Sequence, residues 1–176
     1  NRARRIEGTG NWELKLSEKA MKHGDLYKMH VYWQGGDGER IPAWAQRVVQ
    51  DEETKIFSAQ VWTPEPYVWK KNKFAPCKSP LLIYECHIGM AQDAEKSLID
   101  TAHGMGIAVI MDIVHSHAVK NETEGLGNLA GDPCQYFYGG DRREHPAWDS
   151  LCFDYGKDDV VHFLLSNCKY WMQEFR

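Results

Sequence analysis

The sequence predicts an antiparallel β-sandwich in residues 1–75, followed by an α/β domain in residues 76–176. In the first part, short segments of alternating apolar and polar residues are separated by glycine and proline, the pattern of half-buried antiparallel strands. A proline-rich, basic stretch then interrupts this pattern. Beyond it, continuous apolar runs alternate with apolar residues at helical spacing, which indicates buried parallel strands connected by helices.

The strands of the first part are predicted from strict alternation. Apolar residues alternate with polar or charged ones over 12–16, 27–33 and 57–61, so each range is expected to form a strand with one buried face. The sequence Gly35-Gly36-Asp37-Gly38 follows the second range and predicts a turn, because glycine and aspartate accept a positive φ.

The domain boundary is predicted from proline content. Pro64, Pro66, Pro76 and Pro80 flank the basic run 70–73. Connectors of this composition separate domains, and a lysine-rich run within one is usually solvated. We therefore expect a partial sandwich with its linker to end at residue 75, and we assign no phosphate site to the lysines.

The second part is predicted to begin as strand, helix and strand. Residues 81–84 and 107–114 are apolar runs of the kind found in strands buried on both faces. Between them, residues 98–105 carry apolar side chains at helical spacing, and Gly104 or Gly106 can end this helix. A last helix, with acidic residues in its first turn, is predicted from an apolar stripe formed by Val161, Leu164, Cys168, Trp171 and Phe175.

Composition excludes several classes of function. The net charge of −4 provides no basic field for nucleic acid. No apolar run approaches the ~18 residues of a membrane span, and no signal peptide is visible, so we expect neither nucleic acid nor membrane as a partner. The five cysteines are irregularly spaced, which favours reduced thiols and a cytoplasmic location.

Polar side chains follow both predicted parallel strands, and functional groups in barrels of parallel strands lie at such strand ends. His115 and His117 are two residues apart, so a strand would point both the same way, whereas Asp112 has the other parity and needs a bend to join them. Two such clusters predict a ligand-binding site. Its candidate residues are Tyr84, Glu85, His87, Asp112, His115 and His117.

Several segments resemble the 1,4-α-glucan branching enzymes of the α-amylase superfamily, and the eukaryotic-type subgroup fits best. Tyr84-Glu85-Cys86-His87-Ile88-Gly89-Met90 is similar to the first strand of their catalytic (β/α)8 barrel. The stretch 97–118 is similar to their second helix and third strand, ending in Asp112-Ile113-Val114-His115-Ser116-His117-Ala118. Further similar segments are Ile41-Pro42-Ala43-Trp44, Trp148-Asp149-Ser150 and Phe163-Leu164-Leu165-Ser166-Asn167, the first of them in the glucan-binding β-sandwich.

The resemblance implies glycogen or starch biosynthesis, with an α-glucan such as glycogen, amylose or amylopectin as the partner. It implies that His117 hydrogen-bonds the sugar at the cleavage subsite and that Asp112 helps to hold that subsite in shape. Calcium-bound amylases have an asparagine ligand where this chain has Ser116. The resemblance therefore implies no calcium site, and we predict no metal or other cofactor.

The sequence departs from the family in two places. Lys96 runs directly into Ser97, where the family has another helix and strand, about 50–60 residues or two barrel repeats. A complete barrel needs about 250 residues, so an interrupted, incomplete one is expected here. The chain also ends before the segments that carry the family's nucleophilic aspartate and its general acid/base glutamate. We therefore assign no catalytic residue and expect an inactive fragment.

Two alternatives stay open. His115 and His117 could bind zinc in a metal-dependent hydrolase, which would need further ligands. The chain could also be a truncated gene product or a non-catalytic remnant that binds glucan through its β-rich half. The candidate aromatic platforms for that binding are Trp12, Trp33, Trp44 and Trp62.

Overall fold

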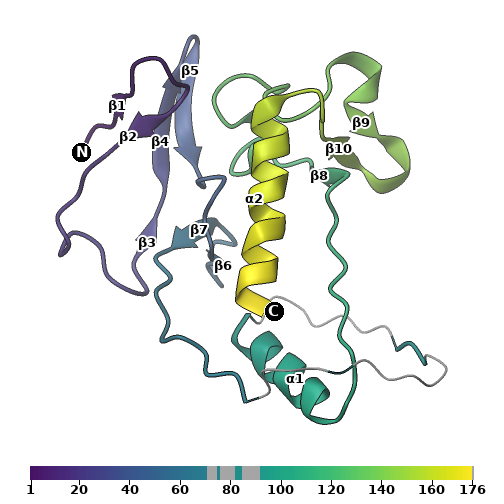
Figure 1. Ribbon diagram of the computed structural model, residues 1–176. Coiled ribbons are helices and arrows are strands. Elements are labelled where there is room, and N and C mark those ends of the chain that lie inside the picture. The colour runs from purple at the N-terminus through teal and green to yellow at the C-terminus, as the bar shows by residue number, and fades with distance from the viewer. Residues whose placement is uncertain (71–74, 76–81, 85–91, 176) are drawn as a thin grey trace. The chain divides into compact units, whose positions relative to one another are not determined.

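The computed structural model describes all residues except 71–74, 76–81, 85–91 and 176 (Figure 1). The chain divides into two compact units. One, here called the β-rich unit, comprises Asn1–Pro64 together with Asn121–Gln135. The other, here called the helical unit, comprises Glu65–Lys120 and Tyr136–Arg176. Residues 121–135 therefore belong to the second half of the sequence but pack with the first 64 residues.

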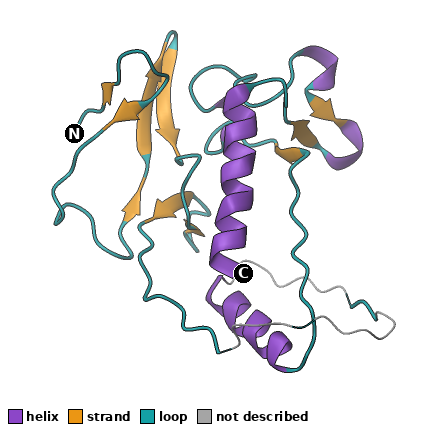
Figure 2. Ribbon diagram, viewed as in Figure 1, coloured by secondary structure: helices purple, strands orange, loops and turns teal. Residues whose placement is uncertain are grey.

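The β-rich unit contains seven short strands among the described residues, in three separate sheets (Figure 2). All of their pairings are antiparallel. β1 pairs with β2, β4 pairs with β5, and β7 lies between β3 and β6. The strand bounds are β1 Arg4–Arg5, β2 Trp12–Glu13, β3 Leu26–Tyr27, β4 Met29–Trp33, β5 Gly36–Arg40, β6 Val48–Gln50 and β7 Phe57–Gln60.

The predicted strands 27–33 and 57–61 are confirmed in substance by β3, β4 and β7, whereas only Trp12–Glu13 of 12–16 forms a strand. The predicted turn is shorter than expected. The hairpin register pairs Trp33 with Gly36, so only the two intervening residues turn, and Gly35 supplies the positive φ of 93°.

The β-sandwich is not confirmed, because the strands fall in small sheets whose alternating apolar side chains stay largely open. Trp12 is 66% exposed, Leu14 45% and Met29 38%, whereas Ala59 of β7 is fully buried. A sandwich requires two sheets that bury their apolar faces against each other. Within the described residues, these faces find no such cover.

In the part of the helical unit that the structure describes there are two α-helices and a three-stranded antiparallel sheet. α1 spans Gln92–Gly104 and α2 spans Asp158–Phe175, and Figure 1 shows α2 as the longer coil. The sheet order is β8-β10-β9, with β8 His117–Val119, β9 Glu144–His145 and β10 Ser150–Cys152. Three 3-10 turns complete the assignment: η1 Leu126–Asn128, in the β-rich unit, η2 Gly140–Arg142 and η3 Pro146–Trp148.

Both predicted helices are confirmed. Gly106, with φ 77°, ends α1: the Ile107 N–H donates to the Ala102 carbonyl and the Gly106 N–H to the His103 carbonyl, a Schellman arrangement. α2 buries Val160, Leu164 and Phe175, so the apolar stripe begins one residue earlier than predicted. The core of this unit is formed by side chains from several segments: Ile99, Tyr136, Phe137, Leu151, Phe153, Val160, Leu164 and Phe175.

The two predicted parallel strands are wrong for this structure, and the described residues close no barrel. Residues 82–84, the described part of the predicted strand 81–84, form no strand, and neither do residues 107–114. Ile83 is 84% exposed and Ile110 87%. A strand forms only where a neighbouring strand satisfies its N–H and C=O groups, and within the described residues no segment pairs with either run.

The Lys96–Ser97 junction lies inside α1. Lys96 Nζ lies 2.6 Å from Glu174 Oε2 near the end of α2, and the Thr101 hydroxyl donates to the Ser97 carbonyl at 2.7 Å. The residues on either side of the junction therefore continue one helix without a break.

Candidate functional site

His117 lies at the start of β8, at the edge of the small antiparallel sheet. It is opposite Cys152 of β10, and β10 also pairs with β9. The sequence instead predicted that His117 would follow the end of a buried parallel strand. The difference has a physical cause: residues 107–114 are not strand here, and the hydrogen-bond partner available to His117–Val119 is antiparallel β10.

Three rings gather at this sheet, from β8, β9 and the turn η3, and we name them the His117 stack: His117, His145 and Trp148. The His117 and Trp148 centroids lie 4.8 Å apart with ring planes at 29°. The His145 and Trp148 centroids lie 4.1 Å apart and nearly parallel, at 8°. Because Trp148 is 61% exposed, the stack presents an aromatic surface to solvent, of the kind that packs against apolar ligand faces.

The polar atoms of the His117 stack are unequally satisfied. Ser116 Oγ lies 2.7 Å from His117 Nδ1, so this contact engages Nδ1 rather than Nε2. His145 Nδ1 is buried and finds no hydrogen-bond partner among the residues that the structure describes. A buried polar atom without a partner usually costs free energy, so the stack is a place where a ligand or a rearrangement would be stabilising.

His115 has different neighbours from His117, although alternation predicted a shared direction. His115 Nε2 lies 2.7 Å from Asn167 Oδ1 of α2, and the Tyr155 hydroxyl donates to the His115 carbonyl at 2.9 Å. Trp171 Nε1 donates to the same Asn167 oxygen at 3.1 Å. His115 therefore connects its segment to α2, while His117 contacts Trp148.

The other candidate residues lie apart from the His117 stack or outside the described residues. Asp112 is exposed, and Tyr84 is 88% exposed. Glu85 and His87 lie outside the described residues. The binding roles expected for these four residues and for His117 stay predictions.

Sequence reasoning missed the polar residues beside the His117 stack. Lys120 Nζ lies 2.9 Å from Glu144 Oε2 and 2.8 Å from Asp149 Oδ1. The hydrogen bonds that the Lys120 ammonium group donates, first to Asp149 and then to Glu144, raise the pKa of Lys120. Lys120 lies more than twenty residues before Glu144 and Asp149 and forms no sequence motif with them, so only the pairing of β8, β9 and β10 brings it to them.

Glu144 and Asp149 both contact one ammonium group, that of Lys120. The arrangement places a cation beside two carboxylates, which are groups that can hydrogen-bond a polar ligand.

The hypothesis that His115 and His117 bind zinc requires further ligands close to them. Within the described ranges, no three His, Cys, Asp or Glu side chains gather closely enough to hold a metal ion. Likewise, no helix in the part of the chain that the structure describes is both long and apolar enough to cross a membrane.

The four tryptophans proposed as sugar platforms divide into two pairs. Trp12 and Trp44 are 66% and 55% exposed. Trp33 lies under the Arg40 guanidinium at 5.0 Å, and a Cβ at Gly131 would collide with its ring. Trp62 lies under Arg47 at 3.9 Å. Only Trp12 and Trp44 therefore leave most of their ring surface open.

Comparison with known proteins gives a consistent result. No family model matches the chain. It is 34% identical to the 1,4-alpha-glucan-branching enzyme of Yarrowia lipolytica and 30% identical to that of Dictyostelium discoideum, in each case over 94% of this chain. It is also 30% identical, over 95% of its length, to the Arabidopsis thaliana protein named 1,4-alpha-glucan-branching enzyme 2-2, chloroplastic/amyloplastic. The chain is a homologue of 1,4-alpha-glucan-branching enzymes. The resemblance expected from the motifs is confirmed.

The chain spans about a third of the length of the branching enzymes that it matches, 34% for the Yarrowia protein. That alignment extends over 234 residues, whereas the chain has 176. The branching enzyme therefore carries residues inside the aligned stretch that have no counterpart here. The expected position of this gap, between Lys96 and Ser97, stays a prediction.

Proposed function

We propose that this chain is a glucan-binding part of a 1,4-α-glucan branching enzyme of the α-amylase superfamily. In this proposal the β-rich unit derives from the carbohydrate-binding module, and the helical unit from the beginning of the (β/α)8 catalytic barrel. The observation that carries the proposal is the 34% identity to a branching enzyme over 94% of the chain. Similarity over nearly the whole chain favours a common origin for both units.

The proposed reaction of the whole enzyme is a retaining transglycosylation. One carboxylate attacks the anomeric carbon of an α-1,4 link while a carboxylic acid protonates the leaving oxygen, and the resulting glycosyl group passes to a 6-hydroxyl. This chemistry requires two carboxyl groups about 5–5.5 Å apart. His117 would hydrogen-bond the sugar at the cleavage subsite, and the exposed face of Trp148 in the His117 stack would lie against it.

We propose that this polypeptide binds glucan but does not catalyse branching, because the resemblance assigns neither carboxyl role to any of its residues. Loss of a nucleophile alone lowers the rate by many powers of ten.

Glucan binding is tested by native electrophoresis of the purified chain in gels with and without glycogen. We expect slower migration in the glycogen gel, relative to a protein of similar size and charge that binds no sugar. Equal relative mobility in the two gels would contradict the proposed function.

Catalysis is tested separately, by the decrease in iodine absorbance when amylose is branched. The purified chain should leave the absorbance at the level of the buffer control, while the full-length Yarrowia branching enzyme lowers it. A decrease caused by the chain itself would show that it carries its own acid and nucleophile, and would contradict the non-catalytic part of the proposal.

A cytoplasmic location is proposed from the cysteines. Cys134, Cys152 and Cys168, the cysteines that the structure describes, are all free thiols, as a reducing compartment favours. The printed name of the Arabidopsis relative places that protein in the chloroplast or amyloplast. Labelling of the native chain with a thiol reagent and expression with a fluorescent tag would test the redox state and the location.

A further inference from the structure

A thiol, an imidazole and a side-chain amide meet in the helical unit, in a cluster that shares no residue with the His117 stack. Cys168 Sγ, on α2, lies 3.5 Å from His115 Nδ1. The other nitrogen of this ring, Nε2, lies 2.7 Å from Oδ1 of Asn167, the residue that precedes Cys168 on α2. The three side chains have the order nucleophile, base and group that orients the base, the arrangement by which side-chain nucleophiles are activated.

A neighbouring indole fixes which nitrogen of His115 carries the proton. Trp171 Nε1–H can only donate, and it lies 3.1 Å from Asn167 Oδ1, so this oxygen acts as an acceptor. Because the same accepting oxygen lies 2.7 Å from His115 Nε2, the proton of the neutral ring is on Nε2. Nδ1 therefore carries the lone pair, and the Cys168 thiol donates its proton toward it.

The imidazole is held in place, while the thiol stays within reach of solvent. The Tyr155 hydroxyl donates to the His115 carbonyl at 2.9 Å, which ties the backbone beside the ring. Cys168 and His115 are each only partly buried. A small reagent can therefore approach the sulfur, whereas fully buried structural cysteines are inert.

We propose that Cys168 is a modification site at which small disulfides, such as oxidised glutathione, form a mixed disulfide with the chain. His115 Nδ1 takes the thiol proton, and the resulting thiolate attacks one sulfur of the small disulfide. The S–S bond of the reagent breaks as the new S–S bond to Cys168 forms, and the departing thiolate takes the proton back from His115. Cys168 is oxidised, and half of the reagent is reduced to a thiol.

Asn167 supports this step, because its oxygen accepts a stronger hydrogen bond from His115 Nε2 while the ring is charged. Asn167 is thus a positioning residue, whereas His115 acts directly on the reacting thiol. The inference does not depend on the proposed glucan binding.

The test is reaction of the full, previously reduced chain with oxidised glutathione, with the mixed disulfide at each cysteine quantified over time by peptide mass spectrometry. Cys152, on β10, is the internal control: its thiol is also partly buried, but it makes no hydrogen bond to an imidazole among the described residues. We expect Cys168 to react at least about tenfold faster than Cys152, a modest part of the ~10²–10⁴-fold typical of a positioned base. In urea, which separates the cluster, the two rates should become similar.

Two variants separate assistance by the base from exposure of the thiol. His115→Gln keeps a polar side chain beside α2 but has no basic nitrogen, so it should slow Cys168 about tenfold and change Cys152 less than about twofold. Asn167→Ala keeps the base without its orienting partner and should slow Cys168 less. Far-UV circular dichroism shows whether each variant is folded.

Equal rates at Cys168 and Cys152 in the folded original chain would overturn the proposal, and this comparison needs no variant to fold. A folded His115→Gln chain whose Cys168 reacts as fast as in the original would overturn it as well, because exposure alone would then explain the reactivity.

Discussion

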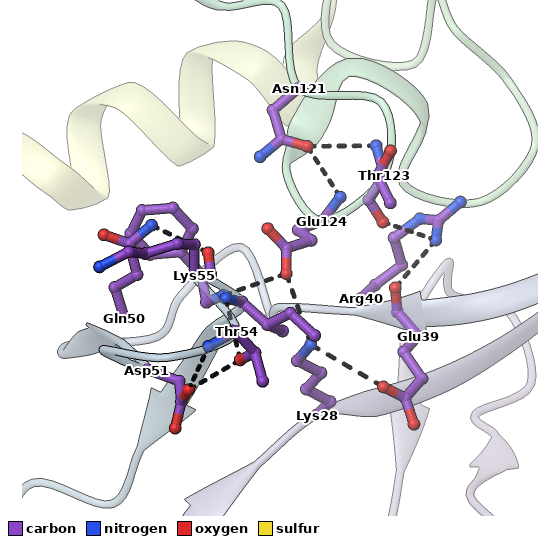
Figure 3. Close-up of polar contacts among 12 residues, drawn as sticks. Lys28, Glu39, Arg40, Gln50, Asp51, Thr54, Lys55, Asn121, Thr123 and Glu124 are labelled. Carbon is purple, nitrogen blue, oxygen red and sulfur yellow. Dashed lines mark hydrogen bonds and ion pairs between the residues drawn. The ribbon is translucent and has the colours of Figure 1, made fainter.

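Replacing Arg40 should loosen the hold of the β-rich unit on residues 121–135. Arg40, at the end of β5, is only 7% exposed. Its Nε donates to the Asn128 carbonyl and its Nη1 to the Thr123 carbonyl, both at 2.9 Å and across more than eighty residues of sequence. Figure 3 shows this guanidinium reaching the Thr123 carbonyl from β5.

The size of the effect follows from these bonds. A hydrogen bond from a charged donor contributes about 1.5–3 kcal/mol net, so losing two costs about 3 kcal/mol even at the lower end. At about 1.4 kcal/mol per factor of ten, the opening equilibrium of the segment rises more than a hundredfold. Among the contacts that remain, the Glu124 side chain accepts the Phe57 N–H at 3.1 Å and lies 3.5 Å from Lys28 Nζ (Figure 3).

Amide hydrogen exchange measured by mass spectrometry reports this opening. In Arg40→Ala, peptides covering 121–135 should exchange about a hundredfold faster than in the original chain. Arg40→Lys should fall between the two, because lysine keeps the charge but lacks the planar fork that reaches two carbonyls. Arg142→Ala is the matched control, since Arg142 is exposed and lies over Tyr138, in the other unit, at 4.0 Å. Unchanged exchange of 121–135 in Arg40→Ala would refute the reasoning.

Two further predictions concern the helical unit. Gly106→Ala should lower the free energy of unfolding by about 1 kcal/mol, because alanine is strained at φ 77°. Gly104→Ala, inside α1, should cause no loss. Urea denaturation followed by circular dichroism compares the midpoints of the two variants, and equal midpoints would contradict the C-cap role of Gly106. Burial, and then the charge of Asp159, raises the pKa of Tyr136 above 10.0, so the folded state holds this proton to higher pH than the unfolded state. The stability that this shift contributes is fully present below pH 10.0 and is lost as the pH rises through the folded pKa. Tyr136→Phe should therefore show a smaller fall in melting temperature above pH 10.0. Parallel curves of melting temperature against pH for the two proteins would contradict this.

The local elements were predictable where they depend on neighbours in the sequence. The period of 3.6 residues places α1 and α2, and the end of α1 follows from a glycine that accepts positive φ. Alternation likewise identifies β4 and β7, whose pairing partners lie within about thirty residues. The runs 81–84 and 107–114 were mispredicted, because a buried parallel strand depends on adjacent strands that the described residues do not supply.

For the candidate site, the sequence predicted which residues to consider but not their contacts. Sequence reasoning singled out His115 and His117, but it assumed that a continuous strand would point them the same way. In the structure, His115 contacts the side-chain oxygen of Asn167 in α2, and the His117 ring stacks on Trp148. Neither Asn167 nor Trp148 was expected there as a ring or amide partner, because contacts across thirty to fifty residues leave no periodic signal in the chain.

By itself, the sequence determined the resemblance to 1,4-alpha-glucan-branching enzymes and the positions of the helices. These depend on residue identities and on short-range periodicity, both of which can be read along the chain. Only the tertiary structure decided that residues 121–135 join the β-rich unit, that His117 stacks with His145 and Trp148, and that Lys120 binds two distant carboxylates. The physical reason is that burial and hydrogen-bond satisfaction act between segments, so the partner of each polar group is set by the strands and helices that are present to receive it.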